Sequence, residues 1–588
     1  MVGKTLLVIL LAVSLNPQAL CSAEVPKKSP TAKDTYTQDP SSHGGTSPAA
    51  NIFGWASWAL QAYRAEGYGY SWVTEANIKA TADVLSREFS SLGFNRINLD
   101  SGWQDAELDK YGRSVLNHTT FPGGIEHLSS YLSQRKLKLG VFYLPGIDAR
   151  AVTNKSPVLN SKYTADQIVQ CPDTQAQGCN RPLANAFGAG IALNYDHPGA
   201  QMYINSVVDS LYSWGVSYVK LDGIVPGSSV EPIEYYKYNT TADLRAWRKA
   251  INELYEQKWS QQGRERILIG ASWKIPTTAG ETMEQYVDSF RIEQGIEAYS
   301  ETETTTFDRV IRNAKTAAVW TSVDANRKWK GIRDLDSILI STMTMAESKS
   351  MVTIWAMVGS LFTLGDDLTK LSDERKALVK NTEVLKLASL ASTNQARLDG
   401  FNPSADSVLQ SVNQKPKSAK TLARRSNNLL QSLTVQACNE LAERRRMVVE
   451  LGCHQKLTDA DKFSKSCMHA HMNDKTMSLM SISASGDGGP DPFSLQTWVL
   501  EGAQGDIYVA VVNAGQQNET DKPASVQLSL SKLQTLQNSP RIKKMTAMQY
   551  QVRNLWEQKD MNKVSFSASL DFKIEVHGSI LLKFTPAQ

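Results

Sequence analysis

Residues Ala200–Gly223, AQMYINSVVDSLYSWGVSYVKLDG, give the clearest indication of the fold class. The first part of this stretch, Ala200–Trp214, has apolar residues near helical spacing, and its second part, Ser217–Leu221, is a short, nearly continuous apolar strand. Strands of this kind are typical of a parallel sheet that is covered by helices. The stretch therefore predicts one helix–strand unit of a βα architecture, with Asp222 directly after the strand.

The same unit recurs along the chain. Helices are predicted over residues 76–92, 125–135 and 241–259, followed by strands over 94–99, 138–143 and 267–270. Several such units between about Phe53 and Leu371 favour a closed (β/α)8 barrel over an open sheet. No G-x-G-x-x-G motif follows the first strand, which argues against a dinucleotide-binding enzyme. We assign residues 51–386 to the barrel.

The pattern changes after the barrel. Residues 404–470 read as a polar helical insertion, and from Leu495 onward short alternating strands return. Such strands are typical of an antiparallel β-sandwich. We therefore assign residues 387–588 to a C-terminal β-sandwich domain that contains the insertion.

The N-terminal residues predict export. Lys4, the apolar run Leu6–Val13 and the small residues Cys21–Ala23 have the layout of a signal peptide, assigned to residues 1–23. Residues 24–50 are rich in Pro, Ser, Thr and Gly and are expected to be a disordered linker. Asn-x-Ser/Thr sequons suit a secreted, extracellular glycoprotein or a vacuolar or lysosomal one.

Charge and cysteine usage exclude several partners. The chain has 63 Lys+Arg against 59 Asp+Glu, so neither nucleic acid nor a membrane is expected as a partner. In an oxidising compartment Cys171 and Cys179 are expected to form a local disulfide, whereas the pairing of the other cysteines of the mature chain stays open. No cysteine or histidine spacing indicates a metal site, and no cofactor is expected.

Acidic residues follow several predicted strands. Asp100, Asp222 and Glu293 come after three of them, and Asp336 lies near the seventh. In a barrel the carboxyl ends of all strands meet on one face, where the chemistry takes place. Paired carboxylates in a cleft are what cleavage of a glycosidic bond requires, so the expected partner is a carbohydrate substrate.

These motifs resemble the melibiase-type α-galactosidases, glycoside hydrolase family 27. The resemblance is carried in order by residues 54–58, 98–103, 121–124, 136–143, 214–223 and 361–368, which read GWASW, NLDSGW, FPGG, KLKLGVFY, WGVSYVKLDG and LFTLGDDL. It implies that Asp222 is the catalytic nucleophile and that Lys220 and Asp100 bind sugar hydroxyls. It also implies pocket roles for further residues: Trp58, Trp103, Ser272, Arg291 and Asp336.

One departure from the family pattern decides the chemistry. The family's general acid/base is an Asp four residues after the matching Arg, and this chain has Gly295 there. Glu293 and Glu297 lie two residues to either side and are the candidate replacements. We therefore expect an α-galactosidase-like retaining hydrolase. The alternatives are an exo-glycosidase for N-acetylgalactosaminides or L-arabinopyranosides, and a catalytically impaired sugar-binding protein. A homodimer is left open.

Overall fold

The computed structural model describes residues 53–171, 184–187, 189–224, 240–323, 331–401, 494–515, 523–546 and 548–587. The predicted signal peptide, the linker, the polar insertion and Cys179 lie outside these residues, so the expected Cys171–Cys179 bond does too. Of the helices described, none is long and apolar enough to cross a membrane.

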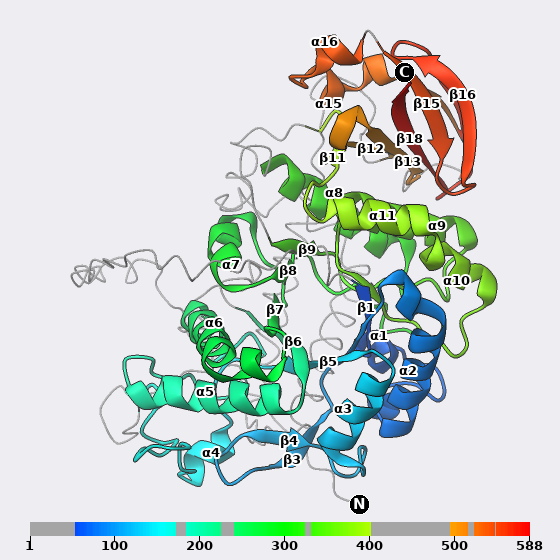
Figure 1. The fold of residues 1–588 in the computed structure, drawn as a ribbon. Coiled ribbons are helices and arrows are strands. Elements are labelled where there is room, and N and C mark those ends of the chain that lie inside the picture. Colours follow the sequence, from blue (N-terminus) through cyan, green and yellow to red (C-terminus); the bar gives the residue numbers. More distant parts are fainter. Residues whose placement is uncertain are drawn as a thin grey trace, which may run out of the picture. The chain divides into compact units, whose positions relative to one another are not determined.

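The first domain is built on eight parallel strands in the sheet order β10-β1-β2-β5-β6-β7-β8-β9 (Figure 1). A parallel bridge between Ile338 and Leu364 joins the segment after β9 to β10 and closes the ring. The prediction of a (β/α)8 barrel is confirmed. The strand bounds are β1 Phe53–Ala56, β2 Arg96–Leu99, β5 Lys138–Tyr143, β6 Val216–Leu221, β7 Leu268–Ala271, β8 Ser289–Arg291, β9 Ile332–Asp334 and β10 Phe362–Leu364.

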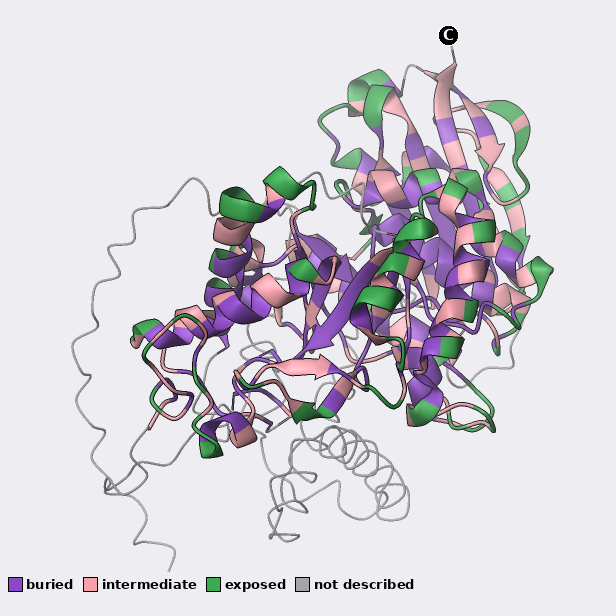
Figure 2. Ribbon diagram, turned by 60° about the horizontal axis from the view of Figure 1, so that its bottom comes forward, coloured by how far each residue is buried: buried purple, intermediate pink, exposed green. Residues whose placement is uncertain are grey.

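Helices surround the strands in Figure 1, and a two-stranded hairpin, β3–β4, follows β2. Figure 2 shows the barrel strands buried and the outer faces of the helices more exposed. The bounds are α1 Trp58–Ala62, α2 Glu75–Phe89, β3 Gln104–Leu108, β4 Ser114–Leu116, α3 Gly124–Gln134, α4 Ala149–Thr153, α5 Pro198–Ser213, α6 Thr241–Leu254, α7 Gly280–Tyr286, α8 Phe307–Val323, α9 Met345–Val358, α10 Asp373–Lys380 and α11 Thr382–Ala391.

The helix α2 shows how the sequence sets these elements. The Thr74 side chain accepts a hydrogen bond from the Asn77 amide and so caps the N-terminus. Ile78, Leu85 and other apolar residues one turn apart are buried against the barrel. A short 3-10 turn follows Phe89, and Gly93 ends it at φ +98°, a conformation that glycine adopts without strain. The chain is thereby redirected into β2.

The C-terminal domain is antiparallel, as predicted. A six-stranded sheet has the order β11-β12-β13-β18-β15-β16, and β14 pairs with β17 in a second sheet. Apolar residues of both sheets, including Val509, Leu528 and Ile574, share one core. The bounds are β11 Arg397–Leu398, β12 Leu495–Glu501, β13 Ile507–Asn513, β14 Ala524–Leu528, α15 Gln534–Gln537, α16 Ile542–Met545, β15 Gln549–Asn554, β16 Lys559–Ser565, β17 Leu570–Ile574 and β18 Ser579–Ala587.

The helix α9 contacts both the barrel and this sheet. It is buried almost all round, which is expected of a helix with apolar residues on every face. On its sheet side, Thr353 lies 3.2 Å from the Ser579 hydroxyl and accepts a hydrogen bond from the Trp556 indole. The C-terminal domain therefore packs against α9. The candidate site lies at the ends of the barrel strands.

Candidate active site

The charged residues of the candidate site follow the barrel strands. Asp100 follows β2, Asp222 follows β6, and Arg291 ends β8. Asp334 ends β9, and Asp336 lies two residues beyond it. Because the strands are parallel, these residues lie at the same, carboxyl edge of the barrel, where barrel enzymes have their active sites.

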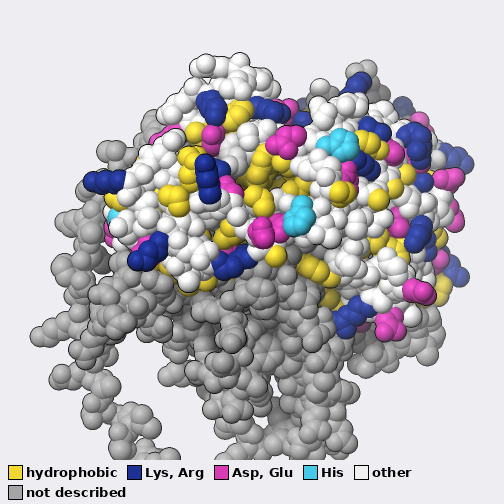
Figure 3. Space-filling model, turned by 90° about the horizontal axis from the view of Figure 1, so that it is seen from below, with side chains coloured by type: hydrophobic (Ala, Val, Ile, Leu, Met, Phe, Trp, Pro, Cys, Tyr) yellow, Lys and Arg dark blue, Asp and Glu magenta, His cyan; other side chains and the backbone are white. Residues whose placement is uncertain are grey.

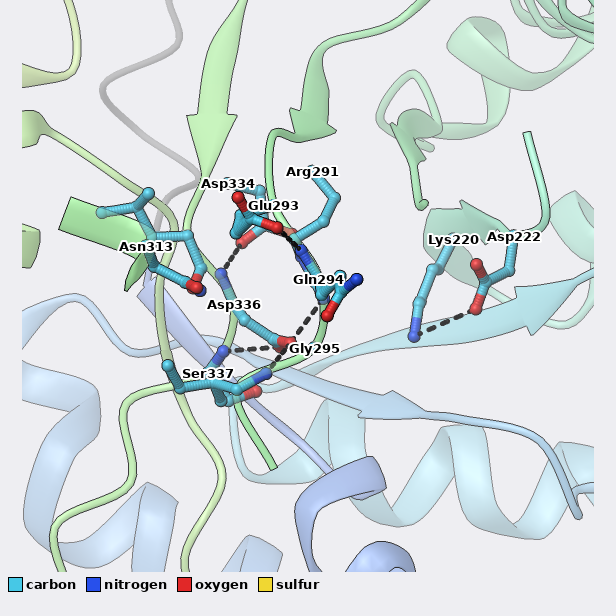
Figure 4. Close-up of polar contacts among 12 residues, drawn as sticks. Lys220, Asp222, Arg291, Glu293, Gln294, Gly295, Asn313, Asp334, Asp336 and Ser337 are labelled. Carbon is cyan, nitrogen blue, oxygen red and sulfur yellow. Dashed lines mark hydrogen bonds and ion pairs between the residues drawn. The ribbon is translucent and has the colours of Figure 1, made fainter. Parts of the chain in front are cut away.

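A lysine links two of these aspartates. The Lys220 ammonium lies 2.6 Å from Asp100 Oδ2. It lies 3.5 Å from Asp222 Oδ2, the contact that Figure 4 shows as a dashed line. The Gly223 amide donates a hydrogen bond of 2.8 Å to Asp222 Oδ1. Burial alone would lower the pKa of Lys220, but the nearby carboxylates of Asp100 and Asp222 outweigh it and raise that pKa. The lysine therefore stays charged and holds both carboxylates in place.

The Asp100 carboxylate is fixed from the other side by the turn after β2. The Ser101 amide donates to Asp100 Oδ1 over 2.8 Å, and the Asp100 amide donates to the Ser57 hydroxyl over 2.9 Å. The Gln61 side chain accepts a hydrogen bond from Ser57 and donates to the Ser101 carbonyl. Ser57 and Gln61 are supporting residues that the sequence reasoning missed, because nothing in their spacing relates them to Asp100.

A second charged group lies across the site. Arg291 Nε donates to Asp334 over 2.9 Å, and its Nη1 donates to Asp336 Oδ2. The Asp336 carboxylate also accepts hydrogen bonds from the Ile296 and Ser337 amides. Burial would lower the pKa of Arg291, but Asp334, Asp336 and other acids outweigh it and raise that pKa. Asp336 thus supports Arg291 and the loop after β8.

Glu293, one of the two candidate acid/base residues, has buried partners. Its Oε1 accepts from Lys274 and from the Gln294 amide, each over 2.8 Å, and its Oε2 accepts from the Thr316 hydroxyl. Burial would raise the pKa of Glu293, but Lys274, Arg312 and these hydrogen bonds lower it overall. A general acid needs a raised pKa, so this environment is the opposite of the one required.

The loop around Gly295 is held by backbone contacts. Arg312 in α8 donates to the carbonyls of Gln294 and Gly295. In Figure 4 the Gln294 side chain lies on the side toward Lys220, and Gly295 lies beside Asp336. Glu297, the other candidate acid/base, is 1% exposed and lies close enough to Arg291 to affect its pKa. The two glutamates therefore have surroundings of their own on either side of residue 295, where the family pattern has its acid/base.

Family models match both domains of the chain. A model described as alpha galactosidase A matches residues 52–156 and 185–389, more than half of the chain. The chain belongs to the melibiase family, glycoside hydrolase family 27. A second model, described as the alpha galactosidase C-terminal beta sandwich domain, matches residues 493–584. The resemblance seen in the sequence motifs is confirmed.

Curated relatives of this melibiase-family chain include alpha-galactosidase 3 of Hypocrea jecorina, 30% identical over 34% of this chain and 28% of the relative. The alpha-galactosidase of Oryza sativa is 23% identical over 56% of this chain and 61% of the relative. The chain thus spans less than two thirds of the length of either relative.

Solved structures of the family share the fold. A GH27 β-L-arabinopyranosidase from Geobacillus stearothermophilus superimposes with a TM-score of 0.59 at 18% identity, covering 92% of this chain and 99% of the other. Alpha-galactosidase I from Mortierella vinacea gives a TM-score of 0.53 at 18% identity, covering 90% and 96%. Both domains of this chain therefore fold as those of family 27 proteins do.

Trp103, one of the expected pocket residues, has buried partners in the barrel. Trp103 is fully buried, its indole donates to the Phe142 carbonyl, and its ring packs against Tyr143 and Trp214. The expected contact of Trp103 with the sugar stays a prediction. Trp58, in contrast, begins α1 and is only half-buried.

Ser272, expected near the sugar 2-position, follows β7 and is tied to the nucleophile turn. Its amide donates to the Leu221 carbonyl, and its own carbonyl accepts from the Ile224 amide. Lys274, two residues later, is the ion-pair partner of Glu293, a role that sequence reasoning missed. Among the described residues, no group of His, Cys, Asp and Glu suits a metal ion.

The buried Lys274–Glu293 pair gives a stability prediction. Glu293→Gln is expected to lower the free energy of unfolding by about 3 kcal/mol at pH 7, because it leaves the Lys274 ammonium buried without its counter-charge. Adding Lys274→Met to the Glu293→Gln variant is expected to restore part of the lost free energy of unfolding. Urea unfolding of the wild type, of Glu293→Gln and of the double variant measures both effects.

The same pair makes that loss pH-dependent. The folded-state pKa of Glu293 is below its ordinary value of 4.5. The stabilisation that the Glu293 charge adds to the free energy of unfolding is therefore complete above the unfolded-state pKa. It is lost as the pH falls through the folded-state pKa. The difference between wild type and Glu293→Gln should shrink below about pH 4.5. A difference that is constant with pH, or zero at pH 7, would contradict a charged, paired Glu293.

Proposed function

We propose that the chain is a retaining glycoside hydrolase of the α-galactosidase type, with Asp222 as its nucleophile. The observation that carries the proposal is the Lys220 bridge, which holds Asp222 and Asp100 at the carboxyl edge of the barrel. A carboxylate that is fixed at the end of a barrel strand is suited to attack on an anomeric carbon. Membership of family 27 supports the same assignment.

In the proposed reaction, Asp222 attacks the anomeric carbon and the glycosidic oxygen leaves with its electron pair. The resulting glycosyl ester is then hydrolysed by water, so the anomeric configuration is retained. Asp100 and Lys220 are proposed to bind hydroxyls of the sugar on the same side. Arg291, held by Asp334 and Asp336, is proposed to lie near the 2-position, with Ser272 beside it.

In the proposed site the proton donor has to be a residue other than Gly295. Glu293 is bound by Lys274 and Thr316 and has a lowered pKa, so we propose that it positions the loop after β8 rather than acting as acid/base. Glu297 remains the candidate donor. If it does not act, only leaving groups that depart without a proton should react well, because general acid catalysis contributes about 10²–10⁴-fold.

A leaving-group series on purified protein tests this proposal. Aryl α-galactosides whose phenols span a wide pKa range should be hydrolysed, with rates falling steeply as the phenol becomes less acidic. Parallel assays with α-N-acetylgalactosaminides and β-L-arabinopyranosides identify the preferred sugar. Binding of a sugar without turnover of any aryl glycoside would contradict the enzyme and favour the sugar-binding protein.

Export through the secretory pathway, with residues 1–23 removed, is part of the proposal. Expression with the native N-terminus, followed by N-terminal sequencing of the protein in the medium, tests it. A mature N-terminus near residue 24 is expected, and retention of Met1 on a cell-associated protein would contradict it.

A further inference from the structure

Asp336 has a backbone conformation that few residues adopt. It lies two residues beyond β9, is 4% exposed and has φ +81°, in the left-handed region that favours glycine. A residue with a side chain stays in this region only where its neighbours hold it there. The contacts of the segment after β9 therefore decide where the Asp336 carboxylate lies.

The residue before Asp336 is bound through both of its backbone polar groups. The Leu335 amide donates to the Ser360 hydroxyl over 2.9 Å, and the Leu335 carbonyl accepts from the Asn313 side chain over 2.9 Å. Leu335, Ser360 and Asn313 are all fully buried. Because buried groups have no solvent to bond instead, these contacts fix the peptide that leads into Asp336.

Trp355, in α9, binds Asp336 itself. Its indole N–H donates to the Asp336 carbonyl over 2.8 Å, and the Trp355 side chain is fully buried. The Asp336 amide donates to Asp334 Oδ1 over 2.8 Å. Asp336 is thus held at its amide by the end of β9 and at its carbonyl by a helix, and these two bonds keep it in the left-handed conformation.

The helix α9 is fixed from its opposite side. Thr353 lies two residues before Trp355, which places the two side chains about 200° apart around the helix axis. The Thr353 hydroxyl accepts from the Trp556 indole over 3.0 Å and lies 3.2 Å from the Ser579 hydroxyl, and both partners belong to the C-terminal domain. Trp355 therefore projects from a helix that the C-terminal domain holds in place.

The Asp336 carboxylate contacts two parts of the candidate site. Asp336 Oδ2 accepts hydrogen bonds from Arg291 Nη1 and from the Ile296 amide. Arg291 ends β8, and Ile296 directly precedes Glu297, the candidate proton donor. A shift of this carboxylate would therefore displace both Arg291 and the segment that carries Glu297.

We propose that Trp355 is a positioning residue of the hydrolytic site, which acts through Asp336 on Arg291 and on the segment of Glu297. This inference rests on the proposed function. Without the indole N–H, Asp336 loses the bond at its carbonyl and relaxes toward negative φ, so that its carboxylate leaves Arg291 and the Ile296 amide. Such a displacement slows the reaction, because reacting groups have to be placed within a fraction of an ångström.

Trp355→Phe removes the N–H and keeps an aromatic ring. It is expected to lower kcat for a nitrophenyl α-galactoside about tenfold, the scale of one buried hydrogen bond. KM should change less than about twofold, since the displaced groups act on the bond that breaks. Rates are expressed per active site, counted by labelling with a fluorosugar, so that unfolded protein does not contribute to the difference.

Trp247→Phe, in α6, is the matched control. Trp247 is 1% exposed, and within the part of the chain that the structure describes its indole N–H has no hydrogen-bond partner. The same substitution is thus made at a buried tryptophan without loss of a hydrogen bond. This variant should keep the kcat and KM of the wild type.

A double-variant cycle separates positioning from a purely structural role. Asp336→Gly removes the carboxylate, and glycine adopts φ +81° without strain. If Trp355 acts through Asp336, adding Trp355→Phe to Asp336→Gly should change kcat less than about twofold. An equal loss of kcat in the wild-type and Asp336→Gly backgrounds would overturn the inference, and so would a wild-type kcat in Trp355→Phe.

A second replacement covers the case in which Trp355→Phe does not fold. β-(3-Benzothienyl)alanine at position 355 replaces the indole N–H by sulfur and keeps the size of the ring system, so the same loss of kcat is expected, and a wild-type kcat would overturn the inference. In all these outcomes the wild type hydrolyses the galactoside, and the proposed function stands. A wild type without turnover would overturn the proposed function and the inference with it.

Discussion

Asp222→Asn should reduce kcat/KM for an activated aryl α-galactoside by at least about 10⁴-fold, the scale seen when a covalent nucleophile is removed. The amide is nearly isosteric, and Gly223 donates to one oxygen of the side chain in either case. Fold and sugar affinity should therefore remain close to those of the wild type. Steady-state kinetics, thermal unfolding and calorimetric titration of the variant measure the three properties separately.

Asp100→Asn is the matched comparison for this variant. Asp100 is also a buried aspartate beside Lys220, but in the proposed reaction it binds hydroxyls and does not attack carbon. The Asp100→Asn substitution should mainly raise KM, whereas Asp222→Asn should mainly lower kcat. The two variants therefore differ in how their loss of kcat/KM divides between kcat and KM. Near-normal kcat in Asp222→Asn, or the same pattern of loss in both variants, would contradict the assignment of the nucleophile.

Gly295→Asp should increase turnover of glycosides with poor leaving groups by about 10²–10⁴-fold, because it adds a carboxyl group where the family pattern has its acid/base. A substrate with a dinitrophenol leaving group, which departs without a proton, should gain little. Gly295 is half-buried, and Arg312 binds its carbonyl rather than its α-carbon, so these contacts do not oppose the new side chain.

Gly295→Asn is the control, since it has the same shape and no proton to give. It should leave the rate on poor leaving groups unchanged. A gain in the Asn variant equal to that in the Asp variant would mean that the effect is one of packing. If Gly295→Asp gives no gain and Glu297→Gln abolishes hydrolysis of poor leaving groups, Glu297 is the proton donor and the site is complete without residue 295.

Local patterns in the sequence predict the barrel closely. The helix and strand expected at residues 200–214 and 217–221 are found as α5 at 198–213 and β6 at 216–221. The predicted strand at 138–143 is β5. These elements follow from apolar periodicity and from breaks such as Gly93, both of which act between neighbours in the chain. The observed ends of these elements differ from the predicted ends by a residue or two, because caps and backbone hydrogen bonds set where a helix or strand ends.

The contacts of the site residues could not be predicted in the same way. Parity along the segment after β8 predicts that Glu293 faces the same way as residue 295, but its partners Lys274 and Thr316 come from the segment after β7 and from α8. The burial of Trp103 by Phe142 and Trp214 likewise depends on residues that are distant in the sequence.

Trapping the glycosyl–enzyme intermediate tests directly whether Asp222 is the nucleophile. The purified protein is incubated with an activated fluorosugar of galactose configuration, which forms the intermediate faster than water removes it, and is then digested and analysed by mass spectrometry. We predict one sugar per chain, attached to the peptide that contains Asp222, with no labelling in Asp222→Asn. Labelling of another carboxylate, or steady turnover of aryl galactosides by a protein that is never labelled, would contradict the assignment of Asp222 as the covalent nucleophile.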